Sequence, residues 1–160
     1  MRMVEVDIGP VVLEAGEGVW LGVLGDLYRF LVTGRATDGQ YAVNEIKSFP
    51  GNGPPLHIHH RESEAFYVLE GRFLLTCGDR MMHVTPGAFV HVPAGTLHTF
   101  KNIGSEPGRL LVVITPAGLE GLLEEVGQPV EDTFSEPPID PAAVQRLLAL
   151  APQYHLEIRL

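Results

Sequence analysis

Five side chains that can bind a metal ion or transfer a proton lie within the segment LHIHHRESEAF, Leu56 to Phe66. They are His57, His59, His60, Glu62 and Glu64. If residues 57–59 form a strand, successive side chains alternate between its faces, so His57 and His59 point one way and His60 the other. Two imidazoles on one face of a strand can reach the same ion. The spacing alone does not decide between Glu62 and Glu64, because the chain must bend before the next strand begins.

A third imidazole comes from the segment PAGTLHTFKN, where His98 follows a Pro-x-Gly turn and enters another strand-like stretch. Together with one carboxylate, the three histidines would make a set of four protein ligands. Imidazole and carboxylate suit Mn, Fe, Co, Ni, Cu or Zn, and the lack of thiolate removes any preference for soft metals. An octahedral ion would then keep two open positions for water, oxygen or substrate. The sequence therefore predicts a metal site that could be catalytic.

Short strands separated by turns must position these side chains. From about Val11 to Thr115, apolar segments of strand length alternate with turns rich in glycine and proline. Turn signals at intervals of about eight to twelve residues are typical of an all-β sandwich or barrel. The predicted strands are residues 26–34, 41–49, 63–71, 72–77, 81–84, 88–92, 97–102 and 109–115.

After Thr115 the pattern becomes helical. Thr115 is predicted to cap a helix that has Pro116 as its first residue. Residues 131–140 have the composition of a linker, and Asp140 followed by Pro141 predicts the start of a second helix. The final LEIRL has the length of a short strand. We expect the short helices to cover a face or an edge of the barrel, or to pack on a partner.

Two longer motifs carry a resemblance to a known family. Residues 51–71, GNGPPLHIHHRESEAFYVLEG, match G-x5-H-x-H-x4-E-x6-G at every fixed position. Residues 87–102, GAFVHVPAGTLHTFKN, match G-x5-P-x-G-x2-H-x3-N in the same way. The chain thus resembles the cupin superfamily, which implies a double-stranded β-helix, a jelly-roll-like barrel of two antiparallel sheets. The resemblance implies that His57, His59, Glu64 and His98 are the metal ligands, and it gives no ligand role to His60 or Glu62.

The flanking segments resemble bacterial single-domain cupins described as quercetin 2,3-dioxygenase-like. This resemblance implies a metal-dependent dioxygenase acting on a flavonol-like or other enolisable small substrate, with O2 as co-substrate. Glu64 is then the candidate catalytic base, because a carboxylate at the metal can take the substrate's hydroxyl proton. Other cupin activities stay open, namely a decarboxylase or an isomerase of a small acid or sugar, as does a non-enzymatic metal-binding or small-molecule-binding module. The resemblance also implies a homodimer.

The composition limits the partners. A net charge of −9, with 11 Lys and Arg spread over 160 residues, argues against nucleic acid and against an anionic membrane surface. We expect no signal peptide and no membrane span. Cys77 is the single cysteine, so no intrachain disulfide can form, and a cytoplasmic protein is expected. The length favours one domain, 1–160, with the barrel at about 23–115 and a helical extension at about 116–160.

We expect the other noted residues in and near these motifs to have mainly structural roles. Arg61 and Glu62 are expected in a solvated bend, while His83 and His91 are expected to be structural strand histidines, with His91 a candidate for a dimer interface. Five apolar residues share the ligand face if alternation continues, and they would fill the core or form an apolar pocket beside the metal. They are Phe66, Val68, Phe73, Leu75 and Phe100.

Overall fold

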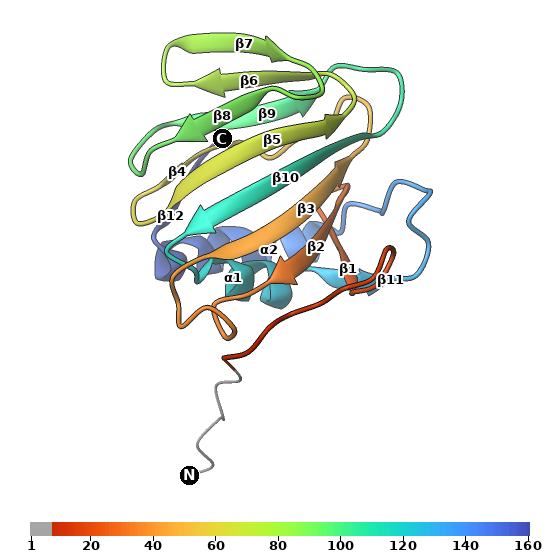
Figure 1. Ribbon diagram of the computed structural model, residues 1–160. Coiled ribbons are helices and arrows are strands. Elements are labelled where there is room, and N and C mark those ends of the chain that lie inside the picture. The colour runs from red at the N-terminus through yellow and green to blue at the C-terminus, as the bar shows by residue number, and fades with distance from the viewer. Residues whose placement is uncertain (1–7) are drawn as a thin grey trace.

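The computed structural model describes residues 8–160, which form two antiparallel β-sheets packed face to face, with helices along one side (Figure 1). The larger sheet has seven strands, and the smaller has five. In spatial order the larger sheet contains β11 (Gln128–Val130), β1 (Trp20–Val23), β2 (Asp26–Val32), β3 (Ala42–Ser48), β10 (Gly108–Thr115), β5 (Ser63–Glu70) and β8 (Phe89–Val92). The smaller contains β12 (Leu156–Arg159), β4 (Leu56–His59), β9 (His98–Asn102), β6 (Phe73–Cys77) and β7 (Arg80–Val84). The predicted all-β double-stranded β-helix is confirmed.

Each strand predicted from turn spacing is present, with ends shifted by a few residues at most. Two strands of the larger sheet, β1 and β11, were not predicted. They pair with each other at the edge of the sheet, and each carries a residue that weakens a strand signal, Gly22 in β1 and Pro129 in β11. Proline is tolerated at such an edge because its missing N–H does not interrupt an interior ladder.

The helices are α1 (Leu119–Val126) and α2 (Pro141–Leu150), and a short 3-10 turn follows at Ala151–Tyr154. The predicted start of the first helix at Thr115 and Pro116 is wrong, because β10 continues to Thr115, which pairs with Ser63. The helix begins after Gly118, whose N–H donates to the Glu120 carboxylate at 2.7 Å.

The predicted start of the second helix is correct. The Asp140 carboxylate accepts a hydrogen bond of 2.9 Å from the N–H of Ala142, and Pro141 is the first helical residue. Such an N-cap satisfies one of the amide groups that the first turn of a helix leaves unpaired. Of the helices in residues 8–160, none combines the length and apolar character that crossing a membrane requires.

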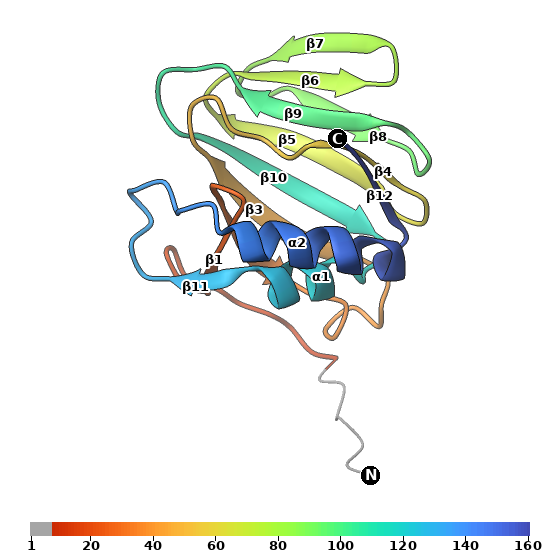
Figure 2. The same ribbon diagram turned by 180° about the vertical axis from the view of Figure 1, so that it is seen from behind.

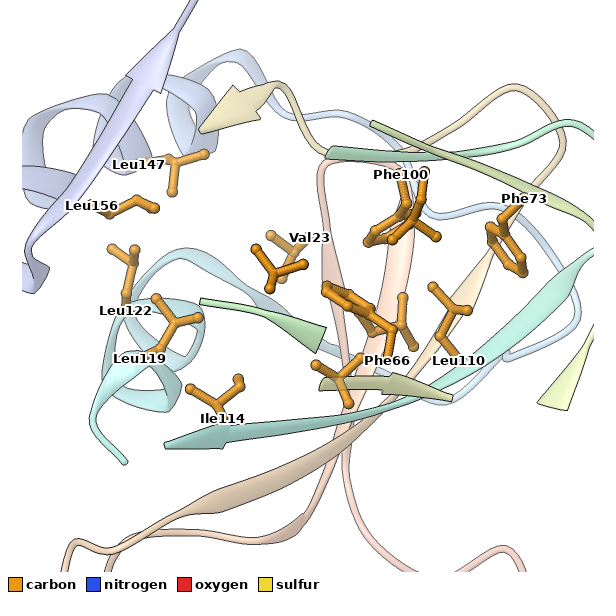
Figure 3. Packing of buried hydrophobic residues seen from close by; sticks show 14 of the residues in the cluster. Val23, Phe66, Phe73, Phe100, Leu110, Ile114, Leu119, Leu122, Leu147 and Leu156 are labelled. Carbon is orange, nitrogen blue, oxygen red and sulfur yellow. The ribbon is translucent and has the colours of Figure 1, made fainter. Parts of the chain in front are cut away.

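The core lies between the two sheets, where alternate residues of each strand point inward. All five apolar residues predicted on the ligand face are buried there, as Figure 3 illustrates for Phe66, Phe73 and Phe100. The ring of Phe100 packs edge-on against those of Phe66 and Phe73, with centroids 6.1 and 5.9 Å apart. Edge-to-face pairs at this separation add to the stabilisation that burial provides.

Both helices cover the side of the barrel between β12, at the edge of the smaller sheet, and the β11–β1 pair at the edge of the larger one (Figure 2). Leu119 and Leu122 of α1 and Leu147 of α2 belong to the same buried cluster as the strand residues (Figure 3). The last strand, β12, pairs with β4 and brings Leu156 against this cluster. The C-terminal segment therefore closes the barrel beside the strand that carries two of the candidate ligands.

Candidate metal centre

The four predicted ligands converge from both sheets onto one point inside the barrel. His57 and His59 lie on β4, and His98 lies on β9, directly opposite His57 in the strand register. Glu64 reaches the same point from β5 in the other sheet. Each of the four offers one ligand atom, and these atoms all lie within 4.8 Å of one another. Because same-face strand residues and cross-strand pairs are close neighbours, β4 and β9 bring three imidazoles together with no special loop geometry.

Backbone carbonyls orient two of the imidazoles. The Nδ1 of His57 donates to the carbonyl oxygen of Pro55 at 2.8 Å, and the Nδ1 of His98 donates to that of Thr96 at 2.9 Å. Since a carbonyl oxygen can only accept, Nδ1 carries the proton in both rings. The Nε2 atoms are thereby left to face the cluster, where the Nε2 of His98 lies 2.7 Å from the Oε2 of Glu64.

The donor set fits a divalent cation. Because the Nδ1 of His98 carries the proton, its Nε2 presents a lone pair, and this atom lies 2.7 Å from the Oε2 of Glu64, which is also an acceptor. The Nε2 of His59 lies 3.4 Å from the same carboxylate oxygen. A dication at this point would satisfy both imidazole lone pairs and the carboxylate, which otherwise face one another as acceptors. Nitrogen and oxygen ligands without sulfur suit several transition metals.

The electrostatics keep Glu64 ionised and His57 neutral. Burial alone would raise the pKa of Glu64, but the charge and hydrogen bonds of His59 and His98 outweigh it and hold that pKa well below its usual range. Burial lowers the pKa of His57 to about 4, and nearby His98 contributes in the same direction. The pKa of His59 is raised, because Glu64 more than offsets the effect of burial. At neutral pH the site therefore presents an anionic carboxylate and an unprotonated imidazole.

A cavity of about 90 Å³ opens beside the cluster, between the two sheets and the helices. Its wall is mainly apolar and includes Phe66 and Phe100 from the strands and Leu122 from α1. Among residues 8–160, no lysine or arginine lines it. The polar lining away from the cluster consists of Tyr28 and Asn44, on β2 and β3.

These two polar residues were not predicted as part of the site. Burial raises the pKa of Tyr28, with help from the charges of Asp26 and Glu64, so its hydroxyl stays neutral. The Oδ1 of Asn44 is buried and has no hydrogen-bond partner within residues 8–160. The sequence signal was available for Asn44, because it takes an inward position between Ala42 and Ile46 in an alternating strand where a nonpolar residue is expected.

The bend after β4 differs from the prediction in one respect. His60 is exposed as expected, and its Nε2 lies 2.8 Å from the carboxylate of Glu157 on β12. Arg61 is partly exposed and donates to the carbonyl oxygen of Ala117 at 2.7 Å. Glu62, however, is only 2% exposed. The prediction that Glu62 lies in a solvated bend is wrong, because its carboxylate turns inward toward His59.

The two other strand histidines, His83 and His91, both lie exposed at the surface. Neither one approaches the cluster of four ligands.

Comparisons with known proteins agree with this architecture. The cupin domain family matches residues 47–114. Quercetin 2,3-dioxygenase from Bacillus subtilis is 32% identical over 136 residues, covering 85% of this chain and 40% of that protein. A sugar phosphate isomerase of the cupin superfamily from Silicibacter pomeroyi is 30% identical, with a TM-score of 0.51 over 57% of this chain and 59% of that one. A predicted oxalate decarboxylase from Thermotoga maritima gives a TM-score of 0.60 at 21% identity, over 67% of this chain and 99% of that one.

These relatives differ in activity, and the chain spans less than half of the dioxygenase's length. The two solved structures share the barrel, and the residues that match the cupin domain family include both motifs' histidines and Glu64. By its two-sheet barrel, its two motifs and its family match, the chain carries a cupin domain at residues 47–114.

Proposed function

We propose that this cupin is a metal-dependent dioxygenase that acts on a small, enolisable organic substrate. The observation that carries the proposal is the opening of a cluster of three histidines and one glutamate onto a mainly apolar cavity. The similarity to quercetin 2,3-dioxygenase over 85% of the chain supports the choice of reaction. In such a reaction the substrate hydroxyl loses its proton, and both atoms of O2 enter the product.

The four clustered side chains have separate roles in this proposal. His57, His59 and His98 would hold the ion through Nε2, as the orientation of their rings allows. A divalent transition metal bound there would supply Lewis-acid stabilisation to the deprotonated substrate oxygen. Glu64 would be a ligand and also the catalytic base, since its carboxylate is ionised and faces the same point from the opposite sheet. Because the ligand set suits several ions, the metal that the protein binds would depend in part on which ions are available to it.

The cavity decides how much of a substrate fits. At about 90 Å³ it is smaller than a dry cavity of about 150 Å³ that accommodates one benzene ring in another protein. A flavonol has three rings, so it could place only its reacting end inside this cavity. We therefore propose that compact enolisable molecules are better substrates. Apolar walls from Phe66 and Phe100 would exclude water around the reacting atoms, which strengthens the electrostatic interactions there.

Oxygen uptake tests the proposal. Protein loaded separately with Mn, Fe, Co, Ni or Cu is mixed with a flavonol or with a small 1,3-diketone such as acetylacetone, and O2 is followed with an electrode. We expect uptake with at least one metal, faster with the diketone, and none with a His98→Ala variant. No uptake with any of these metals and both substrates would refute the dioxygenase.

A decarboxylase of a small acid is the second candidate, and the small volume of the cavity favours it over an enzyme for large substrates. It would release CO2 without consuming O2. An isomerase of phosphorylated sugars is less favoured, because no lysine or arginine of the described residues lines the cavity to bind a phosphate. A module that only binds a metal would not need the space beside the cluster, which Phe66 and Phe100 leave open.

We also propose that the chain forms a homodimer. The outer face of the larger sheet exposes Tyr67 and Phe89 as a cross-strand pair of β5 and β8, at 43% and 64% exposure. Exposed aromatic residues are enriched at protein interfaces. Light scattering that gives twice the mass of one chain, and one chain mass for a Tyr67→Lys and Phe89→Lys double variant, would support this surface. The single 1–160 domain and the cytoplasmic location stay predictions.

A further inference from the structure

The three clustered histidines differ in what their second ring nitrogen meets. For His57 and His98, Nδ1 has a backbone carbonyl oxygen at ordinary hydrogen-bond distance. For His59, Nδ1 is buried and has no hydrogen-bond partner among residues 8–160. The nearest acidic group is the carboxylate of Glu62, whose Oε2 lies 3.8 Å from that nitrogen. One of the three imidazoles therefore faces a charged group where the other two face neutral carbonyls.

The two carboxylate oxygens of Glu62 have different surroundings. Its Oε1 lies 3.7 Å from the Nε of Arg61, which is itself partly exposed. Its Oε2 is buried and, within the described part of the chain, lacks a hydrogen-bond partner. An unpaired buried acceptor beside an unpaired buried donor calls for an explanation, because buried polar groups in native proteins are almost always paired.

We propose that Glu62 is the positioning residue of His59, accepting a hydrogen bond from its Nδ1–H when Nε2 binds the metal ion. A separation of 3.8 Å is too long for this bond, and a closure of about 1 Å would bring it to the usual length of about 2.8 Å for charge-assisted pairs. The bend at residues 60–62 joins β4 to β5 outside both strands, so Glu62 can make this shift without breaking a strand ladder.

Such a bond would fix the tautomer of His59 with its proton on Nδ1, which leaves the Nε2 lone pair for the ion. Metal-binding histidines commonly donate their other N–H to a carboxylate or carbonyl, and this partner orients the ring and strengthens the ligand. Glu62 would thus complete a set in which every candidate imidazole ligand has an acceptor on Nδ1. The inference rests on the proposed metal site and is independent of the reaction catalysed there.

The test compares two glutamate-to-glutamine variants. Glu62→Gln keeps the size of the side chain and removes its charge. Glu157→Gln is the matched control, because Glu157 also pairs with a histidine, the exposed His60, at 2.8 Å. Zinc affinity is measured by competition with a chromogenic chelator. We expect Glu62→Gln to weaken zinc binding by about 10- to 100-fold, the range typical of such outer partners, and the control to bind within twofold of the wild type.

A second measurement, on the wild type and on Glu62→Gln, separates the positioning of His59 by Glu62 from a general effect of the substitution on folding. In zinc-loaded protein with ¹⁵N-labelled histidine, NMR reports which ring nitrogen of each histidine carries the proton. We expect a slowly exchanging Nδ1–H signal from His59 that moves upfield in Glu62→Gln, while the signals of His57 and His98 stay in place. Zinc affinity of Glu62→Gln within twofold of the wild type would overturn the proposal, as would a His59 bound through Nδ1. A wild type that binds no zinc would overturn both the metal site and the role of Glu62. Neither measurement uses oxygen uptake, so both are independent of the proposed reaction.

Discussion

Replacing Leu122 by alanine tests whether helix α1 sets the size of the cavity beside the site. Leu122 is 0% exposed, and its side chain forms part of the cavity wall. Leu110 is equally buried in the same core but does not line the cavity, so Leu110→Ala is the matched control. The two variants remove the same atoms, one from helix α1 beside the cavity and the other from strand β10 away from it.

The expected losses of stability differ for a physical reason. A buried Leu→Ala change costs about 2–5 kcal/mol, and the cost is larger where the surroundings were fully packed. Part of Leu122 already faces open space, so we expect about 2–3 kcal/mol for Leu122→Ala, against about 3–5 kcal/mol for Leu110→Ala. Urea unfolding of both variants beside the wild type measures these values. The slope against urea should be unchanged if only the folded state is affected.

Binding of a small aromatic ligand tests the expected change in the volume of the cavity. Removing the outer carbons of Leu122 should bring the cavity from about 90 Å³ toward the size that holds one aromatic ring, about 150 Å³. We therefore expect phenol to shift the NMR signals of the His57 and His59 rings, which line the cavity, at lower concentration in Leu122→Ala than in the wild type. In Leu110→Ala the response of these signals should match the wild type. Equal responses in both variants would show that α1 does not define the cavity, and a Leu122→Ala loss below about 1 kcal/mol would show that this side chain is not packed as described.

Two further substitutions test buried polar groups. Burial raises the pKa of Asp26 from 3.8 to about 6. The folded state therefore holds this proton more tightly than the unfolded state does. The resulting contribution to the free energy of unfolding is complete below pH 3.8 and is lost as the pH rises to about 6. The loss is about 3 kcal/mol, at about 1.36 kcal/mol per pKa unit. Asp26→Asn should abolish this decline in urea titrations at pH 4 to 7, and an unchanged decline would contradict it. Asn44→Leu should raise the stability of the metal-free protein by about 1 kcal/mol, since the Oδ1 of Asn44 lacks a partner in the described chain. A loss of stability in this variant, measured by the same titration, would mean that the amide is satisfied.

Much of the arrangement of the candidate site could be predicted from alternation and motif spacing. Side-chain alternation placed His57 and His59 on one face of β4 and turned His60 away, and the structure agrees. A glycine of the first motif has a clear structural reason. Gly71 has a φ of 85°, and a Cβ there would lie 2.7 Å from the Cα of Gly108, so only glycine fits this corner between strands.

Other features depend on contacts between distant parts of the chain and were not visible in local patterns. The burial of Glu62 follows from how the bend folds back on His59, which strand alternation does not describe. Thr115 and Pro116 have the residue types of a helix start, but pairing with Ser63 extends β10 through Thr115. Strand β11 pairs with β1, which lies about a hundred residues earlier in the chain. In each case the tertiary partner overrides the local signal.

The central claim, that four side chains form one metal site, is tested most directly by elemental analysis of purified protein. We predict close to one transition metal ion per chain in the wild type and in His83→Ala, where an exposed histidine is removed. We predict loss of this metal in His57→Ala and in His98→Ala, since each removes one of the clustered ligands. Unchanged metal content in both of the latter variants would contradict the site.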